Sequence, residues 1–180
     1  YKRQRIHNMK LGEKQTLTVV KQVDFGVYLA EQQDDETRVL LPAKQVPEGT
    51  KEGDSIEAFI YKDSQDRLIA TTKEPKLQVG QTAVLKVSQV TRIGAFLDWG
   101  LEKDLLLPYS EQIVKVQKGD KYLVGLYVDK SDRLCATMKV YDFLRTDSPY
   151  KKDDHVEGII YETSDNFGVF VAVDNCYSNC

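Results

Sequence analysis

The stretch LGEKQTLTVVKQVDFGVYLA, residues Leu11–Ala30, returns later in the chain as VGQTAVLKVSQVTRIGAFLD, residues Val79–Asp98. Both glycines and many apolar positions match between the two stretches, and Gly26 corresponds to Gly94, 68 residues further on. Self-similarity at a fixed spacing is the sequence signature of repeated structural units. The chain is therefore expected to contain at least two copies of one small domain.

The match continues beyond these two stretches. VLLP at residues 39–42 corresponds to LLLP at 105–108, and DRLIAT at 66–71 corresponds to DRLCAT at 132–137, both 66 residues apart. The drop from 68 to 66 places two extra residues in a loop of the first copy. A third copy starts at HVEGIIYETSDNFGVFVAV, residues 155–173. The expected organisation is an N-terminal tail (1–10), a first domain (11–75), a second domain (76–141), a linker (142–150) and a truncated third domain (151–180).

Each full copy is expected to form five short strands, because apolar and β-branched residues alternate with polar ones between turn residues. In the second copy these strands are expected at about 82–91, 95–99, 104–107, 121–129 and 133–139, with a helical turn within 109–116. Gly94 interrupts an apolar pattern and indicates a β-bulge or sharp bend. Five strands in 65 residues describe the oligonucleotide/oligosaccharide-binding (OB) barrel. The predicted fold is all-β, with two complete OB barrels in tandem and a partial third.

Composition favours a soluble folded chain, because 41% of residues are hydrophobic and 29% are charged. No apolar run approaches the roughly 20 residues that span a bilayer, and no signal-peptide pattern is found, so no membrane segment and a cytoplasmic location are expected. The 3 cysteines and 2 histidines lack the spacing of a disulfide framework or zinc site. No metal and no cofactor are expected.

Three short motifs carry a family resemblance: FGVY at residues 25–28, IGAF at 93–96 and FGVF at 167–170. They resemble the aromatic-Gly-x-aromatic turn of the S1 RNA-binding domain. The tandem copies and their DRL-x-AT endings are similar to the bacterial conserved virulence factor B family, whose members carry three S1 domains and a winged helix. The resemblance covers residues 11 to about 173. It implies a fragment that lacks the end of the third domain and the winged helix.

The resemblance also implies a set of RNA-binding residues. By position in the motifs these are Phe25, Tyr28, Asp63 and Arg67 in the first copy, Phe96, Asp129 and Arg133 in the second, and Phe167 and Phe170 in the third. Two features depart from the family pattern. Pro42 and Pro108 stand where the family has a histidine, and Ile93 replaces the first aromatic of the second copy. Binding is therefore expected to be weaker than in the family type or differently shaped.

Strand alternation bears on whether these aromatic rings lie at the surface. Side chains of a strand point alternately to its two faces, so Phe96 and Asp98 should share the face opposite Ala95 and Leu97. A ring beside a carboxylate is expected outside the core, where it could stack on a base for about 1–3 kcal/mol. The alternative is that the rings fill the barrel core, because aromatic residues also favour strands. For the Asp and Arg positions the alternative is ordinary turn chemistry.

Charge is distributed unevenly between the two domains. Residues 11–75 hold 8 Lys and Arg against 13 Asp and Glu, a net charge of −5, whereas residues 76–141 hold 10 against 7, a net charge of +3. Phosphate binding favours a basic surface, so the second barrel is expected to be the stronger contact. No phosphate-binding glycine loop, nucleophile elbow or HExxH motif occurs, so no enzyme is expected.

The expected partner is single-stranded RNA, and the expected role is that of a post-transcriptional regulatory or RNA-associated factor. Two alternatives stay open. The barrel faces could instead dock a protein partner, because the first barrel is acidic, or the chain could be an accessory module of an RNA-processing complex. The sequence does not indicate the oligomeric state.

Overall fold

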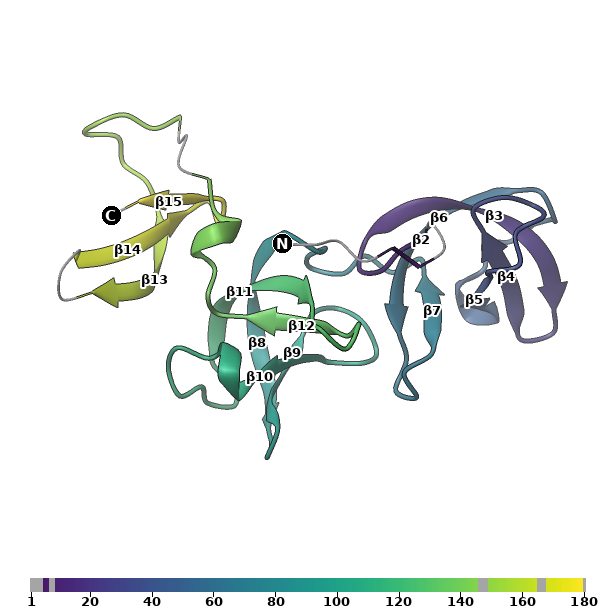
Figure 1. The fold of residues 1–180 in the computed structure, drawn as a ribbon. Helices are drawn as coiled ribbons and strands as arrows, with labels where there is room; N and C mark the ends of the chain where they lie inside the picture. Colours follow the sequence, from purple (N-terminus) through teal and green to yellow (C-terminus); the bar gives the residue numbers. More distant parts are fainter. Residues whose placement is uncertain (1–4, 7–8, 146–148, 165–167, 180) are drawn as a thin grey trace. The chain divides into compact units, whose positions relative to one another are not determined.

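The structure is a computed structural model, and it describes residues 5–6, 9–145, 149–164 and 168–179 (Figure 1). The chain divides into two compact units. The first comprises Tyr1–Val79, Gly100–Lys103 and Tyr127–Leu134, and the second comprises Gly80–Trp99, Asp104–Leu126 and Cys135–Cys180.

The first barrel contains five strands in the closed order β3-β4-β5-β7-β6. The strands are β3 (Lys14–Val23), β4 (Gly26–Ala30), β5 (Val39–Pro42), β6 (Ser55–Lys62) and β7 (Leu68–Thr71), with a 3-10 turn η1 (Ala43–Gln45) after β5. Inward-pointing side chains fill the barrel, and Val19, Leu29 and Leu41 are completely buried. A short hairpin, β1 (Arg5–Ile6) and β2 (Met9–Lys10), precedes it.

The second barrel repeats this arrangement with the closed order β10-β12-β11-β8-β9. Its strands are β8 (Thr82–Val90), β9 (Gly94–Asp98), β10 (Leu105–Pro108), β11 (Lys121–Val128) and β12 (Leu134–Thr137), with η2 (Tyr109–Glu111) after β10. In both barrels the third and fifth strands pair in parallel, and the first strand pairs antiparallel with the second and the fourth. The predicted fold class is confirmed: the chain is all-β and carries two closed five-stranded barrels.

The sequence indicated a bulge or a sharp bend at Gly94, and in the structure Gly94 serves a close approach between strands. Its φ is +147°, and a Cβ atom there would lie 2.3 Å from the backbone oxygen of Leu107. The β-bulge lies across the hairpin in β8, between Val87 and Gln89. Gly94 is therefore required because β10 passes too close for any side chain, while the extra residue in β8 adds the twist that helps to close the barrel.

The helical turn expected within residues 109–116 is shorter than predicted. It covers only Tyr109–Glu111, and Gln112 is already extended at φ −91° and ψ 133°. Two hydrogen bonds hold its end: Thr137 Oγ1 donates to Glu111 Oε2 at 2.6 Å, and Met138 N donates to Glu111 O at 3.0 Å. The β-branched pair Ile113 and Val114 then disfavours a helix.

The C-terminal part forms a three-stranded antiparallel sheet, β13 (Gly158–Ser164), β14 (Gly168–Val173) and β15 (Tyr177–Asn179). A 3-10 turn, η3 (Tyr141–Phe143), lies between β12 and this sheet. At the other end of the chain, Met9 belongs to the segment expected to be a tail, but it is 1% exposed and packs in the first barrel's core.

Candidate nucleic-acid interface

Phe96 points to the outer face of the second barrel. Its neighbours in β9, Ala95 and Leu97, are fully buried, whereas Phe96 is half-buried. In the sheet its register partners are Gln89 on β8 and Leu106 on β10. The ring therefore lies over the middle of the sheet, with part of its surface open to a ligand.

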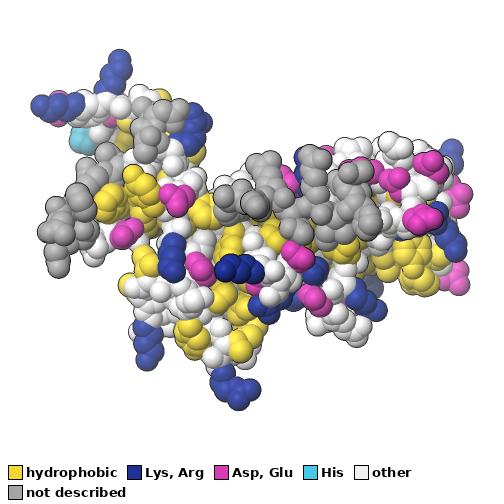
Figure 2. Space-filling model, viewed as in Figure 1, with side chains coloured by type: hydrophobic (Ala, Val, Ile, Leu, Met, Phe, Trp, Pro, Cys, Tyr) yellow, Lys and Arg dark blue, Asp and Glu magenta, His cyan; other side chains and the backbone are white. Residues whose placement is uncertain are grey.

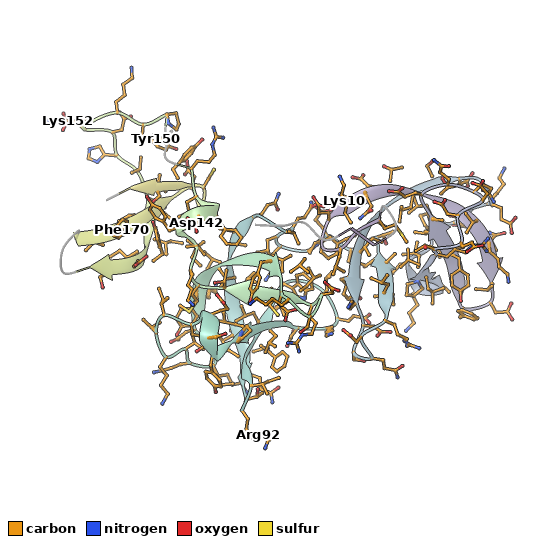
Figure 3. All side chains as sticks on the ribbon, in the orientation of Figure 1. Lys10, Arg92, Asp142, Tyr150, Lys152 and Phe170 are labelled. Atoms are coloured by element: carbon orange, nitrogen blue, oxygen red, sulfur yellow. The ribbon has the colours of Figure 1, made fainter. Side chains whose placement is uncertain are left out.

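The turn between β8 and β9 carries an exposed cation and an exposed apolar side chain. Thr91 closes the turn, with its backbone N and its Oγ1 donating to Gly94 O at 2.8 and 3.0 Å. Arg92 lies at the end of the hairpin and points away from the barrel (Figure 3). Ile93 follows and is 60% exposed. Sequence reasoning did not select Arg92, because it follows no family motif.

Tyr109 was also missed, and the structure places it beside this turn. Its hydroxyl donates a hydrogen bond to Thr91 O, and the residue is 51% exposed. It directly follows Pro108, which pairs with Gly94 across β9 and β10. Tyr109 thus brings an aromatic ring to the turn where Ile93 departs from the family pattern. The aromatic residue directly after LLLP was the signal that could have found it.

We use the term hairpin surface for the side chains of Arg92, Ile93, Phe96 and Tyr109. All of them belong to the second compact unit. Phe96 lies two residues along β9 from Gly94, or about 7 Å, so the ring is close to the turn that carries Arg92 and Ile93 and to which Tyr109 is bonded. Solvent-exposed apolar side chains gather over several parts of the molecule in Figure 2. The hairpin surface combines such side chains with a cation.

The first barrel presents a related but different set. Phe25 is 57% exposed and meets the half-buried Tyr28 edge to face, with ring centroids 6.3 Å apart at 88°. Tyr28 pairs with Lys21 on β3. At the positions that correspond to Arg92 and Tyr109, the first barrel has Asp24 and Ala43. Its two rings are therefore flanked by a carboxylate where the second barrel has a guanidinium.

The predicted Asp and Arg residues pair with each other in both barrels. Asp129 Oδ1 accepts hydrogen bonds from Ser131 N at 2.8 Å and Arg133 N at 3.0 Å, and its Oδ2 accepts one from Arg133 Nε at 3.1 Å. Asp63 does the same, with Arg67 Nε at 3.0 Å. The Asp129–Arg133 turn falls in the first compact unit, whereas the hairpin surface lies in the second.

These hydrogen bonds also lower the pKa of both carboxyl groups. Burial works to raise the pKa of Asp63 and Asp129, but the hydrogen bonds from Arg67 and Gln65, and from Arg133 and Ser131, together with the charge of each arginine, hold each pKa below its ordinary value. The arginine side chains stay 69% and 54% exposed. Each pair therefore stabilises a turn and still presents an open guanidinium edge. A role of these residues in RNA binding stays a prediction.

The third copy places its aromatic residue differently. Phe170 is half-buried on β14, and its ring lies 6.1 Å from Tyr161 and 6.0 Å from Tyr141. It packs against a buried cluster that includes Leu144 and Ala172. This placement favours a packing role over an open stacking surface (Figure 3). Phe167 lies outside the described residues.

Two further findings concern the described part of the chain alone. None of its helices is long and apolar enough to cross a membrane. Nor do its residues hold a group of three or more His, Cys, Asp or Glu side chains that could bind a metal ion.

Comparison with known proteins identifies the repeated unit. The S1 domain family matches residues 11–73 and 79–139. The protein YitL of Bacillus subtilis is 36% identical over 136 residues, which cover 72% of this chain and 44% of YitL. Conserved virulence factor B of Staphylococcus haemolyticus is 32% identical over 91 residues, which cover 48% of this chain and 30% of that protein. The chain thus spans less than half the length of either relative.

A solved structure shares the fold. It is a multidomain protein with nucleic acid binding domains from Streptococcus pneumoniae, which matches 92% of this chain and 60% of its own with a TM-score of 0.65 and 24% identity. The match of the family to most of both barrels, together with these relatives, confirms the resemblance seen in the motifs. The chain belongs to the S1 domain family and is a tandem S1 protein related to conserved virulence factor B.

Proposed function

We propose that this chain binds single-stranded RNA without catalysing a reaction, with the hairpin surface of the second barrel as the main contact. The observation that carries the proposal is the arrangement of Tyr109 and Phe96 beside Arg92. Tyr109 is 51% exposed and bonded through its hydroxyl to Thr91 O, next to Arg92, and Phe96 is half-buried on the outer face of β9. Exposed rings of this kind stack on unpaired bases, and a neighbouring arginine adds charge and cation–π contact.

Arg92 is available to a phosphate or a base. In the part of the chain that the structure describes, no carboxylate lies within ion-pair distance of its guanidinium. A guanidinium at the end of a hairpin can donate two parallel hydrogen bonds to a phosphate. This favours nucleic acid over an uncharged ligand.

The second barrel is favoured over the first by its local charge as well as its net charge. The first barrel has Asp24 in place of Arg92 and Ala43 in place of Tyr109, although it keeps the ring pair Phe25 and Tyr28. Asp24 would repel a backbone phosphate near those rings. We therefore assign the first barrel a weaker contact.

Single-stranded RNA is favoured over duplex RNA because ring stacking requires bases that are splayed out of a helix. The solved neighbour's description as a protein with nucleic acid binding domains supports the same class of ligand. A post-transcriptional role in the cytoplasm, in a protein like conserved virulence factor B, is the setting in which we expect this binding.

The test is a fluorescence anisotropy titration of the chain with single-stranded RNA, duplex RNA and single-stranded DNA of equal length at two salt concentrations. We expect micromolar affinity for single-stranded RNA, weaker binding of duplex RNA, and clear weakening at higher salt. Arg92→Asp, which introduces the first barrel's residue, should weaken binding. Absence of RNA binding at low salt would reject the proposal and favour a protein-binding scaffold.

A further inference from the structure

Three lysines gather on the side of the second barrel, away from the hairpin turn. Lys86 on β8 and Lys121 on β11 are direct partners in the antiparallel ladder. The pairing of β8 continues beyond β11 to Gly119 and Asp120. Gly119 N donates to Val87 O and Val87 N donates to Asp120 O, both at 2.9 Å, and Lys118 directly precedes these two residues. The three residues are exposed. They are named here the lysine cluster.

The lysine cluster borders a hollow on the outer face. Lys86 and Lys118 line a cavity of about 380 Å³ together with Ser88, Asp98 and Gly119. Asp98 on β9 is the register partner of Lys86 on the side of β8 opposite to Lys121. Two lysines and one carboxylate therefore line the hollow, whose lining keeps a positive balance, and Lys121 lies beside it as the ladder partner of Lys86.

The pairing of Lys86 with Lys121 is expected to destabilise the sheet, and the fold alone gives no reason for it. Like charges directly opposite each other on neighbouring strands destabilise a sheet. Among the described residues, no carboxylate lies within ion-pair distance of any of the three lysine Nζ atoms. An anionic ligand would supply the missing counter-charge.

The first barrel serves as an internal control. Its ladder has the same two bonds, from Gly53 N to Val19 O and from Val19 N to Asp54 O, both at 2.8 Å. At the positions of Lys86, Lys118 and Lys121 it has Thr18, Glu52 and Ser55, of which Thr18 and Ser55 are likewise paired. The barrel therefore closes without lysines at these positions, and their presence in the second barrel points to a ligand.

We propose that the lysine cluster binds the phosphate backbone of the RNA as a second contact beyond the hairpin surface. This inference rests on the proposed function. Asp98 is two residues from Phe96 along β9, and Lys86 is one strand over, so the cluster begins about 7 Å further along the same outer face. RNA stacked on Phe96 can continue along β9 and place its phosphates at the lysines. The rings would hold bases, and the cluster would hold phosphates.

The test compares two variants with equal loss of charge. Lys86→Thr, Lys118→Gln and Lys121→Ser together remove the lysine cluster, and Lys51→Gln, Lys130→Gln and Lys152→Gln together remove three exposed lysines elsewhere. Affinity for single-stranded RNA is measured by anisotropy over a series of salt concentrations. Each phosphate contact contributes about 0.7 to the slope of log K against log salt, so loss of the cluster should flatten the slope by about 2. The control should keep most of the slope, and Phe96→Ala should weaken binding at every salt concentration without changing the slope.

A second arm uses inorganic polyphosphate, which has no bases. The parent and Phe96→Ala should bind it alike, and the cluster variant should bind it more weakly. A cluster variant that keeps the parent's slope, while the parent binds RNA, would overturn this inference and leave the proposed function standing. A parent that binds no RNA would reject the proposed function and this inference with it, even if the parent bound polyphosphate.

Thermal unfolding shows whether the cluster variant binds RNA more weakly because it lost phosphate contacts or because it lost stability. The cluster variant should unfold at the parent's temperature or above, because the repulsion between Lys86 and Lys121 is gone. If it unfolds earlier, the reciprocal variant decides: Thr18→Lys, Glu52→Lys and Ser55→Lys build the cluster into the first barrel. That change should steepen the salt slope, and an unchanged slope there would count against the inference.

Discussion

Removing the ring of Tyr109 should weaken the binding of single-stranded RNA. Stacking of one base on an aromatic side chain contributes about 1–3 kcal/mol. Tyr109 is 51% exposed, and its hydroxyl fixes it to Thr91 O, so about half of its surface is free for a base. We therefore expect the lower part of that range for Tyr109→Ala, about 1–2 kcal/mol, or roughly five- to thirtyfold in Kd.

Two companion variants isolate the ring. Tyr109→Phe keeps the stacking face and loses one exposed hydrogen bond, so Kd should rise by about threefold or less. Tyr141→Ala removes a tyrosine of matching exposure, 50%, that packs on Phe170, and it should bind RNA like the parent. Anisotropy titration at one low salt concentration measures all three. The reasoning fails if Tyr109→Ala binds like the parent while Phe25→Ala with Tyr28→Ala loses most affinity, because the first barrel's ring pair would then carry the binding.

Three further predictions concern stability. Gly94→Ala should lower the free energy of unfolding by about 2–4 kcal/mol, because the φ of +147° suits glycine and the added Cβ would meet Leu107 O at 2.3 Å. A denaturant titration that shows no loss of stability would contradict this prediction. The lowered pKa values of Asp63 and Asp129 imply stability that is fully present above the ordinary carboxyl pKa, near 3.9, and is lost as pH falls through the folded values. Asp63→Asn with Asp129→Asn should therefore flatten the fall of melting temperature between about pH 5 and 2, and an unchanged acid limb would refute the assignment. Backbone amides of β13–β15 should exchange with deuterium faster than those of β8–β12, because a three-stranded sheet leaves edges that a closed barrel lacks; equal rates by mass spectrometry would oppose this.

The barrels were predictable because the repeat and the strand alternation report the same architecture. Alternation around Phe96 placed Ala95 and Leu97 inside and Asp98 outside, and the structure has them so. Strand ends were less predictable: β9 was expected at 95–99 and covers Gly94–Asp98. The sequence predicted a bulge or a sharp bend at Gly94, but a glycine in a strand can also mark a close backbone approach, and only the position of β10 decides between these alternatives.

The hairpin surface could be predicted only in part. Phe96 follows from a motif within β9, whereas Tyr109 reaches the turn only because Pro108 pairs with Gly94 across two strands. A pattern search along the chain does not join residues 93 and 109, but the barrel topology does. Similarly, the lysine cluster joins β8 to β11, which are 35 residues apart at Lys86 and Lys121. Register across strands is the information that the linear sequence lacked.

Register also resolves the conflict between charge and motif in the sequence. The first barrel has the better aromatic motif but a net charge of −5, and the second has a net charge of +3 but Ile93 in place of a ring. In the folded second barrel, Tyr109 supplies a ring beside Ile93 from the neighbouring strand's end. The second barrel therefore does have an aromatic ring at the turn, and this ring comes from the 3-10 turn η2 that follows β10. With Tyr109 counted, charge and stacking favour the same barrel, which supports our proposal that the first barrel, with Asp24 in place of Arg92, is the weaker contact.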